Sequence, residues 1–446
     1  MNHEFFPFIP KNIVLRRYDA IDLLNLDTNE DFTIDEEAYE LLKKVNGKIR
    51  IVDIVKKYND TEGKKVLEAL EFFEEEGIIK LSDTEIIDKT VNSLNHLHLP
   101  EKNPFDPPYL KFLMINITEK CNLNCKHCYI TDKNQVDFSF DKLKELIEEF
   151  YNLQGEKIVL TGGEPFLYEK LEELLEFLID IPLKKVLLTN GVLIEKKKHL
   201  LDLIKENNFE VFVSIDGLED THNDFRNANC FNNSIHGIQL MLKKNITVSI
   251  NTMVHKQNLK EFDELSAFLK SFSSIKTWNV EVPTFDDSTP QNILEKYDIS
   301  PEEGGIIMRD YWWGESYDSS GASFGTLSED ESTEDLLTED QGKPMGYACG
   351  PFLMAIDVLG QVSKCGFFTE KSPGNVFDLG IKKSWEGIQK NSVWNIQDLK
   401  CSEINCDVIE ECRGGCRYRA LKHTKDLYGV DAFKCIAYNK NHTKLI

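Results

Sequence analysis

The stretch CNLNCKHCY, residues 121–129, places three cysteines close together and ends on an aromatic side chain. Cys121, Cys125 and Cys128 offer three soft sulfur ligands, and the stretch holds no fourth cysteine. Structural zinc sites generally use four protein ligands, so a zinc site here would need His127, which lies between two of the cysteines, or a remote side chain. Three thiolates that hold a four-iron cluster leave one iron without a protein ligand, and that iron can bind a small molecule.

Length and composition indicate the setting of these cysteines. The chain has 446 residues, more than one core usually organises, so we expect two or three domains. No apolar run approaches the ~18 residues of a membrane span, and the start MNHEFFPFIPKN lacks the basic and apolar regions of an export signal. We therefore expect a cytoplasmic protein. In a reducing compartment its eleven cysteines are metal ligands or redox groups rather than disulfides.

The acidic balance of the chain argues against two classes of partner. At a formal net charge of −24 there is no basic surplus to neutralise phosphates, so we expect neither nucleic acid nor an anionic membrane as a partner. Residues 315–340 contain nine acidic residues and no Lys or Arg. This segment reads as a solvated insertion, with a loop that covers the substrate as the alternative.

Residues 1–98 make up a first predicted domain without cysteine. Strand-like stretches at 13–16 and 22–26 precede helical periodicity at 36–45, 52–58 and 64–75. This order is typical of a small α+β module of winged-helix type. A linker is expected at 99–110, because the prolines of LPEKNPFDPPYL can neither continue a helix nor sit inside a sheet.

Residues 111–284 alternate apolar, strand-like runs with amphipathic stretches, including helices at 140–153 and 171–178. Such alternation predicts a parallel sheet with crossover helices. Six strands are expected, which is too few for a full barrel and indicates a partial (β/α)6 TIM barrel; they lie at 112–117, 157–160, 185–189, 211–215, 247–251 and 278–282. Ligands bind at the carboxyl ends of the strands in such barrels, so the cysteine stretch lies at the functional rim. Residues 285–345 are interpreted as an acidic bridge and 346–446 as a third domain.

The C-x3-C-x2-C spacing with a following aromatic residue resembles the signature of the radical S-adenosylmethionine (SAM) superfamily. The resemblance implies that the open iron chelates the amino and carboxyl groups of SAM. It also implies that an electron from the cluster cleaves the sulfonium bond and yields a 5′-deoxyadenosyl radical. Tyr129 is then expected near the adenine.

A second segment, LTGGEP at 160–165, follows the predicted second strand as it does in the superfamily. The resemblance implies that Gly162 and Gly163 let the backbone approach SAM, and that Glu164, followed by Pro165, pairs with the SAM amino group. A turn before a helix would by itself also explain these four residues.

Two further segments match at the ends of the third and fourth strands: TNG at 189–191 and SIDG at 214–217. The resemblance places Ser214 and Asp216 near the SAM ribose or carboxylate, with Arg226 as a bidentate partner of the carboxylate. Asn190 is a further candidate for SAM binding, with an Asx or capping turn as the alternative. His222 and His255 are expected to be ordinary loop or core histidines.

Seven C-terminal cysteines resemble the SPASM domain, an extension that holds two auxiliary four-iron clusters. The resemblance implies an outer cluster held by Cys401, Cys406, Cys412 and Cys435, and an inner cluster held by Cys349, Cys365 and Cys416. Zinc ribbons are the alternative, but seven thiols do not divide into two four-cysteine sites. Four residues separate the first two cysteines of the block CSEINC, where the common form has two, and this wider spacing resembles the subtilosin-type sactipeptide maturases.

The inner set lacks a fourth cysteine, because residues 350–364 contain none where sulfatase maturases supply one. We therefore expect an open iron there, at which a peptide cysteine could dock. Cys230, in the stretch RNANCFNN, is expected to hold no metal because it belongs to a different domain from the SPASM set.

The first domain resembles the peptide-recognition element of enzymes that modify ribosomally made peptides. Such an element adds an extended leader peptide to its sheet edge and helix groove; a DNA-binding winged helix, weakened by the acidic balance, and a structural cap are the alternatives. The expected function is thioether formation between a cysteine sulfur and a carbon of a precursor peptide, using SAM, three four-iron clusters and an electron donor such as flavodoxin or ferredoxin. The alternatives are carbon–carbon bond formation or side-chain oxidation by the same chemistry, and a non-catalytic iron–sulfur electron carrier or peptide chaperone.

Overall fold

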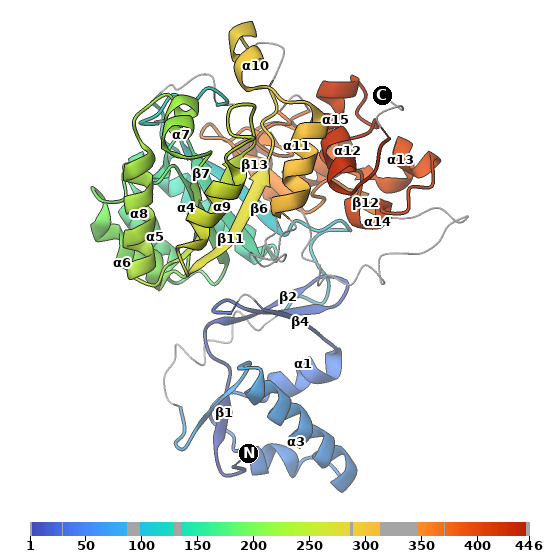
Figure 1. The fold of residues 1–446 in the computed structure, drawn as a ribbon. Coiled ribbons are helices and arrows are strands. Elements are labelled where there is room, and N and C mark those ends of the chain that lie inside the picture. Colours follow the sequence, from blue (N-terminus) through green and yellow to red (C-terminus); the bar gives the residue numbers. More distant parts are fainter. Residues whose placement is uncertain are drawn as a thin grey trace. The chain divides into compact units, whose positions relative to one another are not determined.

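The computed structural model describes residues 2–28, 30–86, 99–128, 130, 135–285, 289–312, 346–369 and 371–442 (Figure 1). Tyr129 and the acidic segment 315–340 lie outside the described residues. The chain forms two compact units: the first comprises Met1–Tyr109, Phe150–Glu156 and Leu178–Lys184, and the second comprises the remainder. Within the described residues no helix is long and apolar enough to cross a membrane.

The first unit combines two small antiparallel sheets with three helices. One sheet has the order β2-β3-β4 and the other pairs β1 with β5. The strands are β1 (Phe6–Phe8), β2 (Ile13–Arg17), β3 (Ile21–Asn25), β4 (Asp31–Ile34) and β5 (Lys80–Ser82), and the helices are α1 (Glu36–Leu42), α2 (Ile51–Val55) and α3 (Asp60–Glu75). The predicted strands and helices are confirmed, although α3 begins four residues early because Asn59 and Glu62 form a capping box.

A buried arginine ties β2 to the two inserted segments of the first unit. Arg16 is 2% exposed, and its guanidinium donates hydrogen bonds to the carbonyls of Gly155 (2.7 Å), Leu15 (3.0 Å) and Pro182 (3.3 Å). Carbonyl oxygens thus satisfy a cation that would otherwise be costly to bury. Arg16 therefore serves as a structural anchor within the unit.

The second unit is built on an eight-stranded sheet with the order β11-β10-β9-β8-β7-β6-β13-β14. The six predicted strands are confirmed as β6 (Phe112–Thr118), β7 (Lys157–Gly162), β8 (Lys184–Thr189), β9 (Glu210–Ser214), β10 (Thr247–Met253) and β11 (Ile275–Glu281). The sheet has two strands more than predicted. β13 (Leu353–Ile356) pairs in parallel with β6, and β14 (Val362–Ser363) forms a hairpin with β13.

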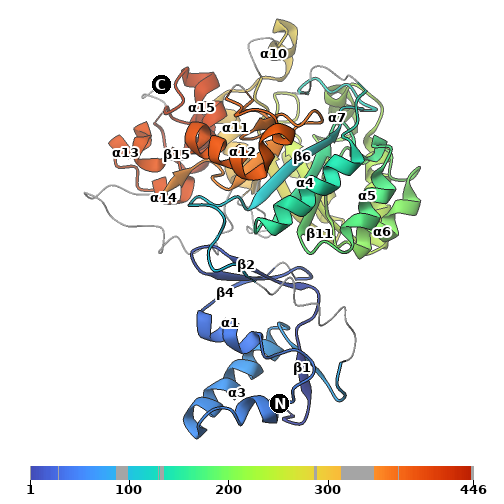
Figure 2. The same cartoon turned by 180° about the vertical axis from the view of Figure 1, so that it is seen from behind.

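Helices follow these strands and line the outside of the sheet in Figures 1 and 2. They are α4 (Phe140–Asn152), α5 (Leu171–Leu178), α6 (Leu201–Glu206), α7 (Glu219–Arg226), α8 (Phe231–Lys243) and α9 (Phe262–Lys270). Strands buried on both faces carry apolar residues at successive positions. Val186 and Leu187 are neighbours on β8, so their side chains point to opposite faces of the sheet. Both are buried, which shows that β8 is covered on both faces.

The C-terminal region of the second unit is built from short elements around a core that includes cysteines. Its elements are β12 (Tyr347–Ala348), α12 (Val376–Ser392), β15 (Trp394–Asn395), α13 (Lys400–Glu403), α14 (Ile409–Cys412), α15 (Arg417–Thr424) and α16 (Ala432–Ala437). Cys401 and Cys435 belong to the buried cluster of this core, and Cys349, Cys365 and Cys406 pack against it. Two helices, α10 (Gln291–Tyr297) and α11 (Pro301–Ile307), precede the region.

Candidate active site

The loop that carries the first three cysteines begins where β6 ends. The two glycines of LTGGEP pack against the backbone at the start of this loop. Gly163 N–H donates to the carbonyl of Thr118, and Glu164 N–H donates to that of Lys120, both at 2.8 Å. A Cβ atom on Gly162 would lie 2.3 Å from the Thr118 oxygen, and one on Gly163 would lie 2.4 Å from the Lys120 oxygen. Both positions therefore require glycine so that two backbones can meet. Their predicted approach to SAM stays a prediction.

The side chain of Glu164 is completely buried and already bonded within the protein. Its carboxylate accepts hydrogen bonds from the Thr189 hydroxyl (2.7 Å), the Asn190 N–H (2.8 Å) and the Phe166 N–H (3.2 Å). Burial raises the pKa of Glu164, and these donors oppose the rise. The contacts make Glu164 a support for the turn after β8. Its pairing with the SAM amino group, like the role of Pro165, stays a prediction.

Asn190 serves both as a turn residue and as a link to the cysteine loop. Its Oδ1 accepts from the Val192 N–H at 3.0 Å, which is the Asx turn that the sequence offered as an alternative. Its Nδ2 donates to Oδ1 of Asn122 at 2.9 Å, and Asn122 directly follows Cys121. Asn122 was not among the predicted site residues, because the sequence next to Cys121 does not show which side chain Asn122 contacts.

Asp216 and Arg226 form a buried ion pair that reaches a cysteine of the loop. Arg226 Nε lies 2.5 Å from Asp216 Oδ2, and Arg226 Nη1 lies 3.7 Å from Cys125 Sγ. Burial alone would raise the pKa of Asp216, but Arg226 and neighbouring groups hold it at about 2, so the carboxylate stays ionised. Arg226 was predicted to bind the SAM carboxylate; here its partners are Asp216 and Cys125. Ser214, which ends β9, is partly exposed.

Two histidines and a phenylalanine stack near this ion pair. The Phe225 ring lies between His127, at 4.2 Å between centroids, and His255, at 3.9 Å. Burial lowers the pKa of His127 to about 3 and that of His255 to about 4, so both rings are neutral. The stack packs as core, which is the role expected of His255.

His222 and Cys230 form a second buried pair in the same region. The Asp216 N–H donates to His222 Nδ1 at 3.1 Å, so the His222 proton is on Nε2, which faces Cys230 Sγ at 3.4 Å. Burial raises the pKa of Cys230 to about 11 and keeps it a thiol. Cys230 is thus hydrogen-bonded to a histidine. Cys125 is the cysteine whose charge acts on the pKa of Cys230.

The seven C-terminal cysteines gather into two groups. In the inner group Cys349 and Cys416 share a hydrogen bond that lowers the pKa of Cys349, and both are close enough to Cys365 for their charges to interact. In the outer group the charges of Cys401, Cys406 and Cys412 all act on Cys435. These interactions join cysteines of the same predicted ligand set, and the binding of a cluster by either set stays a prediction. Within the described residues no three side chains are arranged to hold a single metal ion.

A buried carboxylate fixes the inner group to the sheet. Asp431 accepts from the Cys416 N–H at 2.7 Å and pairs with Arg419 at 3.0 Å. Arg419 also pairs with Glu281, the last residue of β11, at 2.8 Å. Cys416 is thereby anchored at the carboxyl end of the sheet. These three charged residues were missed in the sequence, where they lie far apart and match no motif.

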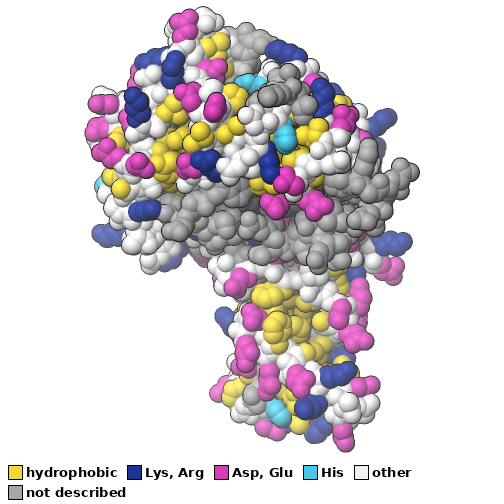
Figure 3. All heavy atoms as spheres, turned by 45° about the vertical axis from the view of Figure 1, so that its right-hand side comes forward, with side chains coloured by type: hydrophobic (Ala, Val, Ile, Leu, Met, Phe, Trp, Pro, Cys, Tyr) yellow, Lys and Arg dark blue, Asp and Glu magenta, His cyan; other side chains and the backbone are white. Residues whose placement is uncertain are grey.

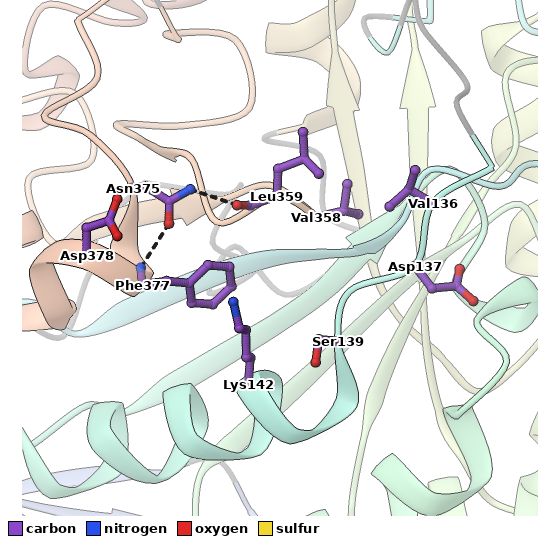
Figure 4. Close-up of a pocket in the computed structure, with 9 residues that line it drawn as sticks. All are labelled: Val136, Asp137, Ser139, Lys142, Val358, Leu359, Asn375, Phe377 and Asp378. Atoms are coloured by element: carbon purple, nitrogen blue, oxygen red, sulfur yellow. Dashed lines mark hydrogen bonds between the residues drawn. The ribbon is translucent and has the colours of Figure 1, made fainter.

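The structure also contains a cavity of about 440 Å³ between the starts of α4 and α12 (Figure 4). Lys142 Nζ lies 4.1 Å from the centroid of the Phe377 ring across this cavity. The lining residues are Val136, Asp137, Ser139, Lys142, Val358, Leu359, Asn375, Phe377 and Asp378. None of the predicted site residues is among them, so the cavity is not part of the candidate active site.

Comparison with known proteins identifies the central part of the chain. Residues 115–269 match the radical SAM superfamily. These residues form a radical SAM domain. Such a domain implies a four-iron cluster and SAM, and the residues present fit the cluster: Cys121, Cys125 and Cys128 are partly exposed thiols on one loop at the carboxyl end of β6, with an arginine donor at Cys125.

Three curated proteins illustrate the sequence similarity. An uncharacterized protein of Methanocaldococcus jannaschii is 33% identical over 36% of this chain and 59% of its own length. An AdoMet-dependent heme synthase of Methanosarcina barkeri is 26% identical over 70% of this chain and 92% of its own length. The cysteine-type anaerobic sulfatase-maturating enzyme of Clostridium novyi is 24% identical over 75% of this chain and 96% of its own length.

Solved structures share the fold at lower identity. SuiB of Streptococcus suis bound to its precursor peptide SuiA superposes with a TM-score of 0.63 and 17% identity, covering 96% of this chain and 99% of SuiB. The enzyme anSMEcpe with bound AdoMet and the Cp18Cys peptide gives a TM-score of 0.57 and 20% identity, covering 74% of this chain and 95% of that chain. At these identities the likeness concerns the fold alone.

Proposed function

We propose that the protein is a radical SAM enzyme that forms thioether cross-links in a ribosomally made precursor peptide. The observation that carries the proposal is the gathering of Cys349, Cys365 and Cys416 into a three-cysteine group anchored to the end of β11. A three-thiol group of this kind suits a cluster that receives a thiol from outside the protein. A fold shared with a peptide-bound enzyme along nearly the whole chain supports a peptide as substrate.

In this proposal the first cysteine loop holds the cluster that cleaves SAM. When bound, SAM and this cluster would supply a 5′-deoxyadenosyl radical that removes a hydrogen atom from an unreactive C–H bond. The role of the chain is to hold the loop in shape: Gly163 and Glu164 bind its start and Asn190 binds its middle at Asn122. The Arg226 guanidinium donates to the sulfur of Cys125, and Asp216 keeps that guanidinium in place.

The net reaction balances without a further oxidant. Cationic SAM, one C–H bond and one S–H bond give methionine, 5′-deoxyadenosine, a C–S bond and a proton. One electron enters from a donor such as flavodoxin or ferredoxin, and one electron leaves when the carbon radical bonds to the thiolate. The two C-terminal cysteine groups would hold auxiliary four-iron clusters that accept this second electron, with Cys401, Cys406, Cys412 and Cys435 binding the outer one.

The first unit is proposed to bind the leader of the precursor. Among the described residues β4 is an edge strand of its sheet, and an edge strand is where an extended peptide can be added. Beside it, Phe72 on α3 is 47% exposed and meets the Phe32 ring of β4 edge-on at 6.5 Å. Figure 3 shows hydrophobic side chains gathered on this unit with acidic side chains along their border. An apolar leader residue would pack on Phe72.

The test is anaerobic incubation of the iron-loaded protein with SAM, a reductant and the precursor peptide. Thioether formation predicts 5′-deoxyadenosine, a peptide that has lost two hydrogens, and a cysteine that iodoacetamide no longer alkylates. Carbon–carbon bond formation would give the same mass change but leave the cysteine open to alkylation. An electron carrier would yield no 5′-deoxyadenosine.

A further inference from the structure

Arg417, which directly follows Cys416, is a buried cation with unusual surroundings. It is fully buried, and its guanidinium donates hydrogen bonds to the carbonyls of Leu427 (3.1 Å) and Gly429 (2.8 Å) and to that of Gly414. Its Nε–H is also buried, and among the described residues it has no hydrogen-bond partner. A buried guanidinium normally has all its donors satisfied and a negative partner.

Arg417 lies beside the turn that joins the two cysteine groups. Its guanidinium Nη2 donates a hydrogen bond to the carbonyl of Gly414, and Gly414 stands between Cys412 of the outer group and Cys416 of the inner group. Its backbone N–H donates a hydrogen bond to Cys349 of the inner group. The buried cation is therefore placed where it can act on a cluster held by either group.

The stretch CRGGC at 412–416 makes room for this side chain. Gly414 has φ +77°, and a Cβ atom there would lie 2.2 Å from Leu399 Cδ1 and 3.3 Å from Arg417 Nη2. A larger residue at 414 would push against the guanidinium. The local backbone is thus shaped to keep Arg417 where it is.

Arg419, two residues later in the same core, differs from Arg417 because carboxylates pair with its guanidinium. It is paired with Asp431 at 3.0 Å and with Glu281 at 2.8 Å. In the part of the chain that the structure describes, the guanidinium of Arg417 donates only to backbone carbonyls, although Asp426 and Asp431 are close enough to interact with its charge. No carboxylate is therefore hydrogen-bonded to this guanidinium.

We propose that Arg417 sets the reduction potential of the two auxiliary clusters by stabilising their reduced forms. Reduction adds one negative charge to a cluster, and a buried cation nearby favours that charge. Hydrogen bonds to sulfur and net charge are the levers by which proteins tune such potentials, and Arg417 offers both its charge and an unused N–H. The inference rests on the auxiliary clusters of the proposed function.

The test is a redox titration, followed by electron paramagnetic resonance, of full-length protein in which Cys121, Cys125 and Cys128 are replaced by Ala. We expect Arg417→Gln to lower the ratio of reduced to oxidised auxiliary cluster at least tenfold at the midpoint of the parent, equivalent to ~59 mV for one electron. Arg417→Lys keeps the charge and should change the ratio less than threefold. The matched controls are Arg16→Gln and Arg16→Lys, which alter a similar buried arginine far from any cysteine in sequence.

Unchanged potentials in an iron-loaded Arg417→Gln protein would overturn the inference while the proposed function stands. If the parent protein binds no auxiliary iron, it has no auxiliary clusters, and both this inference and the proposed function are refuted. If Arg417→Gln loses its iron, citrulline can be placed at 417 by ligating a synthetic 416–446 peptide at Cys416. Citrulline keeps the shape and the Nε–H but not the charge, so the same tenfold loss is expected, and its absence would equally overturn the role of the charge.

Discussion

Asn190 Nδ2 donates a hydrogen bond to Asn122 Oδ1 at 2.9 Å and so joins the end of β8 to the loop between Cys121 and Cys125. The loop is bound at its start by backbone bonds from Gly163 and Glu164, and this side-chain bond adds a second point of attachment. Two attachments on neighbouring strands limit the conformations in which three thiols can present themselves to one cluster.

Asn190→Asp should weaken this attachment without removing the turn. Aspartate keeps the acceptor for the Val192 N–H but loses the Nδ2 donor, at a cost of ~1 kcal/mol for one hydrogen bond. We expect 5′-deoxyadenosine formation to fall about fivefold, as it should in Asn122→Ala, and the double variant should be no worse than either single one. Additive losses in the double variant would show that the two side chains act independently.

Replacing Cys121, Cys125 and Cys128 together with Ala should abolish 5′-deoxyadenosine formation and leave the iron of two clusters bound. The reason is that the C-terminal groups use other cysteines. Iron content and product are measured on the same sample. As a control, Cys230→Ala removes a cysteine bonded to His222 and should leave both quantities unchanged; SAM cleavage by the triple variant would refute the assignment.

Acid should destabilise the protein through its buried histidines. The pKa of His255 is about 4 in the folded protein because of burial, against 6.5 ordinarily, so on acidification the unfolded chain takes up its proton first. The stability contributed by the neutral ring is therefore complete above about pH 6.5 and is lost as the pH falls toward 4, by ~1.4 kcal/mol per pH unit. His255→Gln should flatten urea-unfolding free energies between pH 6.5 and 4.5 by about that slope. A slope equal to that of the parent would contradict the burial effect.

Phe72→Ala should lower the affinity for the precursor peptide about tenfold, as expected when an aromatic anchor is truncated, and leave SAM cleavage intact. The side chain is 47% exposed, so its removal should cost little stability. Affinity is measured by fluorescence anisotropy with a labelled precursor. Leu359→Ala, which truncates an apolar side chain that is 62% exposed in the second unit, is the matched control. Equal affinities for both variants and the parent would leave α3 without a part in peptide binding.

The sheet strands were predictable because burial on both faces leaves a continuous apolar run in the sequence. The run at 157–160, for example, lies in β7, which extends only two residues further. The strands β13 and β14 were not predicted because they are short. They also follow the acidic segment, where the sequence does not show the alternation of strands and helices that predicts a sheet strand. Their place beside β6 depends on tertiary pairing over a long sequence separation.

The residues of the candidate site could be predicted where they belong to a motif with a fixed spacing. They could not be predicted where their role depends on contacts between residues that are distant in the sequence. The resemblance to the SPASM domain implied the two C-terminal ligand sets, and cysteines of each set interact with one another in the structure. Their role as cluster ligands stays a prediction. The carboxylate of Glu164, by contrast, is occupied by Thr189 and Asn190. Asn122, Arg419 and Asp431 carry no local pattern, because their partners are distant in the sequence.

The pairing of β13 with β6 has a consequence for how the chain is made. β6 is hydrogen-bonded on one side to β7 and on the other to a strand that begins at Leu353. During synthesis one edge of β6 therefore stays open while more than half of the protein emerges from the ribosome, and open strand edges invite pairing with other chains. A nascent chain halted before residue 353 should therefore be prone to aggregate, because the strand that would cover this edge of β6 has not yet been made.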